Sequence, residues 1–487
     1  MAIRPRQFGG FLLLAALVWL APGGRPAEAG PAADRFSRFV VRVFYDEPLQ
    51  IRQLSGFDVW EQGSAAERYV LVYVDGDEYR QLVESGLRVE VDPTYTELAR
   101  TVPPAPDATL AGIPGFPCYR TVEETFASAE QMVVDHPGLA AWIDVGDSWE
   151  KTVGPAGYDL MVLRLTNGSV PGPKPKLFVT CSIHPREYAT AELCTRFAEQ
   201  LLARHERDAD VTWLLDHHEI QLMLIANPDG RKQAETGLLW RKNTNDTYCR
   251  QQEDRRGADL NRNFEFEWAC CGGSSPRECD ELFHGPWAAS EPETQAVQGH
   301  LQAEFPDQRD DPLDAPVDDL ATGIYLDVHA SGDLVLWPWG FAGEAPDHVQ
   351  LQTLGRKMAY FNGYTAKQGV QLYPTDGTTT DFAYGAQGVA AFTFELGDWF
   401  FQDCAAFEEA ILPTNLAPLL YAAKAARTPY LTPSGPDALA LRAAPALVGA
   451  GATLRIEAII DDTRYNQDGG AEPSQAIAGA EGYLDLP

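Results

Sequence analysis

Apolar and polar residues alternate along the chain with two periods, which predict strands and helices in a main body from about residue 118 to residue 428. Short apolar runs typical of buried strands occupy residues 160–165, 176–181, 219–226, 323–330 and 389–396. Helical spacing marks residues 121–136 and 190–205. Strands that alternate with helices predict an α/β fold, here an open, twisted, mixed β-sheet flanked by helices.

Smaller patterns lie on both sides of this body. Residues 39–45, 68–74 and 87–91 alternate like half-buried strands, with helical patterns at 47–54 and 77–86. A stretch rich in Pro, Gly and Ala follows, as in a linker. We therefore predict a small α/β unit, the N-terminal module, at residues 30–110, followed by a larger domain, the body, at residues 111–428. The alternation at 453–460 predicts a short β-rich extension at 429–487.

The first 29 residues are predicted to be a signal peptide. Arg4 and Arg6 precede an apolar run at 11–20, and Ala27-Glu28-Ala29 fits a cleavage site. The run is about half the length of a membrane-spanning helix. We expect a secreted, extracellular chain that has no membrane association after signal removal.

Cysteine content and charge refine this picture. Eight cysteines in an exported chain favour disulfides, although Cys181 and Cys194 lie in apolar patterns and are expected to be buried free thiols. The formal net charge is −32, and the sequence shows no cluster of basic residues. A nucleic-acid partner is therefore not expected.

Polar side chains stand at the ends of the predicted buried strands, where open α/β sheets bind ligands. His184 and Glu187 follow the strand at 176–181, and His329 stands in the strand at 323–330. A catalytic zinc ion takes three protein ligands and leaves a position for water, so these three residues are a candidate zinc site. By themselves, a glutamate in a first helical turn and a lone core histidine are more often features of ordinary packing than metal ligands.

Further candidate chemistry lies in other segments. Arg241, Asn261 and Arg262 offer donors that suit a carboxylate ligand, although single arginines more often form surface ion pairs. Glu395 follows a mostly apolar run, which favours either a general base or an interior salt bridge.

Nine motifs in order resemble the zinc metallocarboxypeptidases of the carboxypeptidase A type, and most closely the secreted bacterial carboxypeptidase T-like members. They are CYRTVEET, SIHPREY, NPDG, WRKN, DLNRNF, HGPWAASEPET, DVHASG, YPTDGTTTDFAYG and FTFELG. The resemblance implies a zinc-dependent exopeptidase that hydrolyses the C-terminal peptide bond of peptides and proteins with a free C-terminus.

The resemblance also implies roles for individual residues. His184, Glu187 and His329 would hold one Zn²⁺, with Asp259 orienting His184. Glu395 would be the base that activates the zinc-bound water, and Arg241 would stabilise the oxyanion. The substrate would be bound by Arg186, Asn261, Arg262, Tyr373 and, at the base of the pocket for the terminal residue, Thr380.

Departures from the family leave specificity open. Ser331 replaces a tyrosine beyond the second histidine, and Thr380 stands where Asp would indicate basic terminal residues. A neutral Thr favours hydrophobic or aromatic residues, but Asp376 nearby leaves a mixed preference open.

The resemblance extends beyond the active site. The N-terminal module resembles a pro-region that caps the cleft until proteolysis, and Arg100 is a candidate cleavage site. Cys249 would pair with Cys279 and Cys118 with Cys404, while Cys270 and Cys271 stay unassigned. In the extension, Asp461 and Asp468 offer ligands for Ca²⁺ but do not match the EF-hand pattern.

Two other functions remain as alternatives to a monomeric, secreted zinc carboxypeptidase. One is a zinc amidase that acts on cell-wall stem peptides. The other is a non-catalytic peptide-binding relative, against which the presence of Glu395 argues. No G-x-S-x-G motif supports a serine hydrolase.

Overall fold

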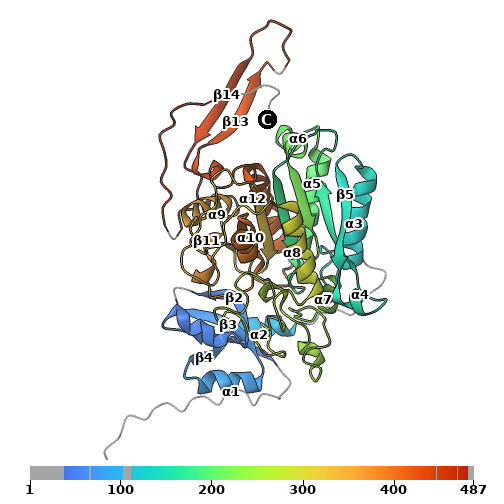
Figure 1. Ribbon diagram of the computed structural model, residues 1–487, viewed down its shortest axis with the longest axis vertical. Helices are drawn as coiled ribbons and strands as arrows, with labels where there is room; N and C mark the ends of the chain where they lie inside the picture. The colour runs from blue at the N-terminus through green and yellow to red at the C-terminus, as the bar shows by residue number, and fades with distance from the viewer. Residues whose placement is uncertain (1–37, 65–66, 102–110, 446, 469, 481–487) are drawn as a thin grey trace, which may run out of the picture.

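The computed structural model describes residues 38–64, 67–101, 111–445, 447–468 and 470–480 (Figure 1). The predicted signal peptide lies outside these residues. Among the described residues, none of the helices has the length and apolar character needed to cross a bilayer.

An eight-stranded mixed sheet forms the centre of the body, in the order β11-β10-β12-β9-β7-β8-β6-β5. Its strands are β5 (Ala140–Asp147), β6 (Asp159–Leu165), β7 (Lys176–Cys181), β8 (Glu219–Met223), β9 (Ile324–His329), β10 (Leu334–Trp337), β11 (Thr365–Gln368) and β12 (Ala390–Glu395). The four strands in the middle, β12, β9, β7 and β8, run parallel to one another. Their carboxyl ends therefore meet at one edge of the sheet.

Helices cover both faces of this sheet, which confirms the predicted fold class (Figure 1). One face is covered by α3 (Val122–Asp135), α5 (Tyr188–Arg204), α9 (His348–Asn362) and α12 (Leu412–Ala425), and the other by α8 (Pro292–Glu304) and α10 (Thr379–Gln387). Shorter helices are α4 (Trp149–Val153), α6 (Ala209–His217), α7 (Pro228–Ala234) and α11 (Cys404–Ala406). The middle strands are buried on both faces, which explains why they are almost continuously apolar.

The N-terminal module is a four-stranded antiparallel sheet in the order β2-β3-β1-β4. It contains β1 (Phe39–Phe44), β2 (Asp58–Ser64), β3 (Tyr69–Val74), β4 (Arg88–Val91), α1 (Gly76–Glu84) and α2 (Pro93–Arg100). Alternation in its strands buries Val41 and Val72 in a second cluster, which also contains Tyr373 of the body, while Val40 and Trp60 join the core of the body. The module is thus packed onto the body through both sets of side chains.

The C-terminal extension is a two-stranded antiparallel ribbon, β13 (Asp437–Ala444) and β14 (Arg455–Asp461), at the end of the molecule opposite the module (Figure 1). Lys357 of α9 lies 3.1 Å from Asp437 at its base. The Asp461 carboxylate accepts hydrogen bonds from Thr463, and calcium binding in this extension stays a prediction.

All eight cysteines are paired. The bonds Cys249–Cys279 and Cys118–Cys404 agree with the pairings that the resemblance implies, and Cys270 is bonded to its neighbour Cys271. The expectation of free thiols at Cys181 and Cys194 is wrong, because β7 and α5 pack so that their sulfur atoms are bonded.

Candidate active site

His184 and Glu187 lie in the short connection between β7 and α5. Ser182, with φ of 56°, turns the chain sharply after the strand, and Glu187 occupies the N-cap position of α5. The His184 Nδ1 atom lies 2.9 Å from Glu187 Oε1. The sequence spacing therefore places both side chains at the edge where the parallel strands end.

His329 completes a cluster of three possible metal ligands. It is the last residue of β9, and its Nδ1 atom lies 3.1 Å from His184 Nδ1 and 3.2 Å from Glu187 Oε2. All three residues are buried, and their ligand atoms lie within 4.8 Å of one another. Two imidazole nitrogens and a carboxylate that converge in this way fit a catalytic zinc ion.

Electrostatics within the cluster favour a carboxylate anion beside two imidazoles. Burial alone would raise the pKa of Glu187, but the two histidines outweigh it and lower that pKa to about 2. Burial likewise opposes charge on His329, yet the carboxylates of Asp327 and Glu187 raise its pKa well above the ordinary value. The carboxylates around the two histidines therefore attract positive charge to this site, whether a proton on His329 or a bound cation.

Each histidine also has a carboxylate at its second nitrogen. His184 Nε2 lies 3.1 Å from Asp259 Oδ1, as the resemblance implies. His329 Nε2 lies 2.8 Å from Asp327 Oδ2, a contact that sequence reasoning missed. The sequence did indicate this contact, because residues two apart on one strand, here 327 and 329, point to the same face of the sheet. These contacts leave both Nδ1 atoms directed at the centre of the cluster.

Glu395 ends β12 directly beside His329, its partner in the parallel ladder. Its side chain is buried, and among the described residues its Oε2 atom has no hydrogen-bond partner. Burial, followed by the charge of Glu61, raises the pKa of Glu395 well above the ordinary value. The described part of the chain contains no salt bridge to this residue, which argues against a purely structural ion pair.

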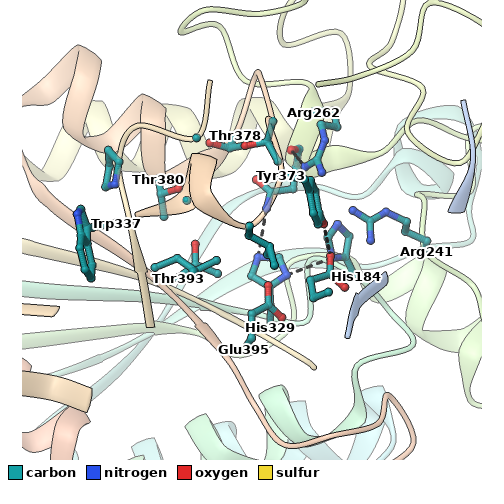
Figure 2. Close-up of a pocket in the computed structure, with 18 residues that line it drawn as sticks. His184, Arg241, Arg262, His329, Trp337, Tyr373, Thr378, Thr380, Thr393 and Glu395 are labelled. Atoms are coloured by element: carbon teal, nitrogen blue, oxygen red, sulfur yellow. Dashed lines mark hydrogen bonds between the residues drawn. The ribbon is translucent and has the colours of Figure 1, made fainter. Parts of the chain in front are cut away.

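Donors for an anionic ligand line the same pocket. Arg241, Asn261, Arg262 and Tyr373 lie around the cluster, with Tyr373 between Arg262 and the two histidines (Figure 2). Arg241 is held through its Nε atom, 2.9 Å from Asp259 Oδ2, while its buried Nη1 atom has no partner within the described chain. These arginines are therefore buried in the site and are not surface ion pairs.

A close backbone approach brings the loop of Tyr373 against Arg262. Gly377 has φ of +63°, and a Cβ atom there would lie 2.5 Å from the Arg262 carbonyl oxygen. Only glycine fits both the left-handed conformation and the contact. The loop that carries Tyr373 then leads into α10, where Thr380 stands, and both residues line one pocket.

The far part of the pocket, on the other side from Arg241, contains Trp337, Thr380 and Thr393 (Figure 2). Leu336 and Gly340 also line the pocket. Asp376 does not, because its carboxylate accepts hydrogen bonds from the Cys271 and Gly273 amides and from the Ser274 hydroxyl. The wall of this part is thus neutral at Thr380.

Two acidic side chains of the N-terminal module reach the site, and sequence reasoning did not identify them. The Arg186 guanidinium donates to both oxygens of Asp58, at 2.8 and 2.9 Å. The Tyr373 hydroxyl donates to Glu61 at 2.6 Å, and Glu61 lines the pocket. The module therefore occupies residues that the resemblance assigns to substrate.

Known proteins are similar to this chain in sequence. A zinc carboxypeptidase of Saccharothrix mutabilis subsp. capreolus is 30% identical over 294 residues, and carboxypeptidase A1 of Rattus norvegicus is 27% identical over 296 residues. Both alignments cover 58% of this chain and 62% of the relative, which is less than two thirds of the relative's length.

Solved structures agree on the fold. Thrombin activatable fibrinolysis inhibitor aligns with a TM-score of 0.61 and 21% identity, over 80% of this chain and 99% of that one. Carboxypeptidase A from Helicoverpa armigera aligns with a TM-score of 0.63 and 22% identity, over 81% and 99%. The family profile described as zinc carboxypeptidase matches residues 126–416, more than half of the chain. With this match and the His184–Glu187–His329 cluster, the chain belongs to the zinc carboxypeptidase family.

Proposed function

We propose that this protein is a secreted zinc metallocarboxypeptidase that removes single residues from the C-terminus of peptides. One observation carries the proposal: donors suited to a free carboxylate line the same pocket as the three candidate zinc ligands. A guanidinium such as that of Arg262 matches a carboxylate in shape and charge. A pocket built in this way favours cleavage at a chain end over cleavage within a chain.

Each residue of the site has a separate role in the proposed hydrolysis of the peptide bond. When bound by His184, Glu187 and His329, zinc would supply Lewis-acid polarisation of water and the scissile carbonyl. Glu395 takes a proton from the attacking water as the oxygen–carbon bond forms. It returns that proton to the nitrogen as the carbon–nitrogen bond breaks. The Nη1 atom of Arg241, which lacks a partner in the described chain, is suited to donate to the developing oxyanion.

The neutral pocket supports a preference for hydrophobic or aromatic terminal residues. Thr380, Thr393, Leu336 and Trp337 supply no charge to it. The Asp376 carboxylate already accepts three hydrogen bonds from residues 271–274, so it offers little to a basic side chain. A mixed preference that includes Lys and Arg is therefore disfavoured.

The N-terminal module acts in this proposal as an inhibitory pro-region. Asp58 neutralises Arg186, and Glu61 accepts a hydrogen bond from Tyr373 where substrate would lie. Arg100 is exposed at the end of α2 and remains the proposed cleavage site. Release of the module would free both Arg186 and Tyr373 for substrate.

A zinc amidase for cell-wall peptides, the alternative from sequence, is not favoured by the family match. A non-catalytic role is disfavoured because Glu395 is present beside His329.

The experiment uses purified chain after limited proteolysis, with peptides that differ only in a terminal Phe or Lys. We expect one residue to be released from the Phe peptide, at least tenfold faster than from the Lys peptide. A zinc chelator should abolish release, and added Zn²⁺ should restore it. Activity that survives full removal of zinc would contradict the proposal, and faster release of Lys would contradict the stated preference.

A further inference from the structure

We propose that Asp327 is a positioning residue that fixes His329 and increases the zinc affinity of the site. The inference rests on the proposed zinc function and assigns a role to a residue outside the three ligands. Asp327 is fully buried in the middle of β9, two residues before His329. Burying a carboxylate is costly unless it is paired or functional.

The Asp327 carboxylate receives hydrogen bonds from three elements. His329 Nε2 lies 2.8 Å from Oδ2, and the Thr180 hydroxyl of β7 donates to Oδ1 at 2.8 Å. The Thr379 hydroxyl, in the first turn of α10, donates to Oδ2. Since Thr180 and Asp327 are partners in the parallel ladder, the backbone holds this geometry.

This arrangement determines which nitrogen of His329 is available to a metal. His329 Nε2 lies 2.8 Å from Asp327 Oδ2 and 3.2 Å from Asn261 Nδ2, so the carboxylate is its closer partner and its only acceptor of these two. With Nε2–H directed at Asp327, the lone pair of Nδ1 points toward His184 and Glu187. A carboxylate partner of this kind fixes the tautomer and the ring orientation and makes the imidazole a stronger ligand.

The charge of Asp327 is less compensated than that of Asp259. Asp259 is paired with Arg241 through Nε, 2.9 Å from Oδ2. The described residues contain no lysine or arginine ion pair to Asp327, whose other partners are the two neutral hydroxyls. Of the two carboxylates, Asp327 therefore leaves more negative charge for its histidine and for a bound cation.

The same contacts connect the metal ligand to the substrate pocket. Thr379 donates its backbone N–H to Asn261 Oδ1 at 2.9 Å, which orients the amide proposed to bind the substrate carboxylate. Its neighbours Thr378 and Thr380 line the pocket. Asp327 and Thr379 thus connect His329 to Asn261, whose Nδ2 atom also lies 3.2 Å from His329 Nε2.

A purely structural role would make a different prediction. If Asp327 served only to join β7, β9 and α10, its replacement would lower the free energy of unfolding but would not change the zinc affinity of the folded protein. Affinity and the ligand field of the metal therefore separate the two roles.

The test uses Asp327→Asn, which removes the charge and keeps the size, in the full chain. The zinc dissociation constant is measured by competition with a chromophoric chelator, and the melting temperature is measured in parallel. We expect zinc binding to weaken about 10–100-fold, the range typical of lost outer-shell partners. The absorption bands of the Co²⁺-substituted protein should also shift at equal occupancy, which a structural role would not cause.

A second variant keeps the proposal open to refutation if Asp327→Asn does not fold. Thr180→Val removes one donor to Asp327 and leaves every contact of His329 in place. We expect a several-fold loss of zinc affinity from it. Wild-type zinc affinity in a folded Asp327→Asn variant, or in Thr180→Val if only that variant folds, would overturn the role of Asp327. Failure of the wild-type chain to bind zinc would instead overturn the proposed function.

Discussion

Removing the carboxylate of Asp58 should release the N-terminal module from the active site. In the structure this carboxylate and Arg186 form a two-point ion pair, with distances of 2.8 and 2.9 Å and side chains 1% and 0% exposed. Burial raises the pKa of Asp58, but Arg186 outweighs burial and leaves that pKa lowered. The pair is therefore charged at neutral pH.

The magnitude follows from burial. Removing one partner of a buried ion pair leaves the other charge unpaired and costs about 3–5 kcal/mol. Asp58→Ala should impose this cost only on the docked state, because Arg186 can reach water once the module leaves. The ratio of undocked to docked chains should then rise by about 10²–10⁴.

The assay measures hydrolysis of a short free-acid peptide by uncleaved chain. Basal activity of Asp58→Ala should rise toward that of proteolysed enzyme, while the rates after proteolysis should be equal for variant and wild type. Arg88→Ala is the matched control, because its ion pair with Glu90 lies on an exposed strand of the module. That variant should keep the low basal rate.

Unchanged basal activity in Asp58→Ala, with normal activation by proteolysis, would exclude the Asp58–Arg186 ion pair as the contact that keeps the module docked. It would mean that the hydrophobic contacts around Trp60 hold the module without the ion pair. A lower rate after proteolysis would instead indicate that Asp58 is needed for folding of the body.

Three further predictions concern single residues. Thr380→Asp should shift kcat/KM toward peptides ending in Lys or Arg by about 10²-fold relative to Phe, because it places an anion in a neutral pocket. Glu395→Gln should lower kcat about 10²–10⁴-fold while metal analysis shows unchanged zinc, as expected for loss of a general base. Burial lowers the pKa of His218 to about 3, so the unfolded chain binds its proton first and stability falls as pH drops from 6.5 toward 3. Chemical unfolding of His218→Leu should lack up to ~1.4 kcal/mol per pH unit of that slope, and an equal slope in both proteins would exclude His218 as its source.

The sequence predicted correctly those parts of the fold and of the candidate site that depend on short stretches of the chain. Apolar runs identified β7, β9 and β12, and polar residues at their ends predicted the edge where His184, His329 and Glu395 meet. The resemblance implied that Tyr373 binds substrate, and the structure places it in one pocket with Glu395. These features could be predicted because they depend on the order of the strands along the chain and on which residues follow each apolar run.

Contacts between distant segments were not predictable in this way. Asp58 and Arg186 are 128 positions apart, and their pairing depends on how the N-terminal module docks. The bond between Cys181 and Cys194 depends on how α5 crosses β7, although both residues had the apolar surroundings of free thiols. From the sequence, Asp376 was a candidate for binding a basic terminal residue. Its three hydrogen bonds come from residues about 100 positions away, which the sequence does not reveal.

Recognition of a free C-terminal carboxylate can be measured by mass-spectrometric analysis of the products from two peptides that both end in Phe, one with a free carboxylate and one amidated. After removal of the module, we expect loss of the single terminal Phe from the free-acid peptide only, and no products in the presence of a zinc chelator. Cleavage of the amidated peptide at a similar rate, or cuts within either peptide, would contradict carboxylate recognition by Asn261, Arg262 and Tyr373.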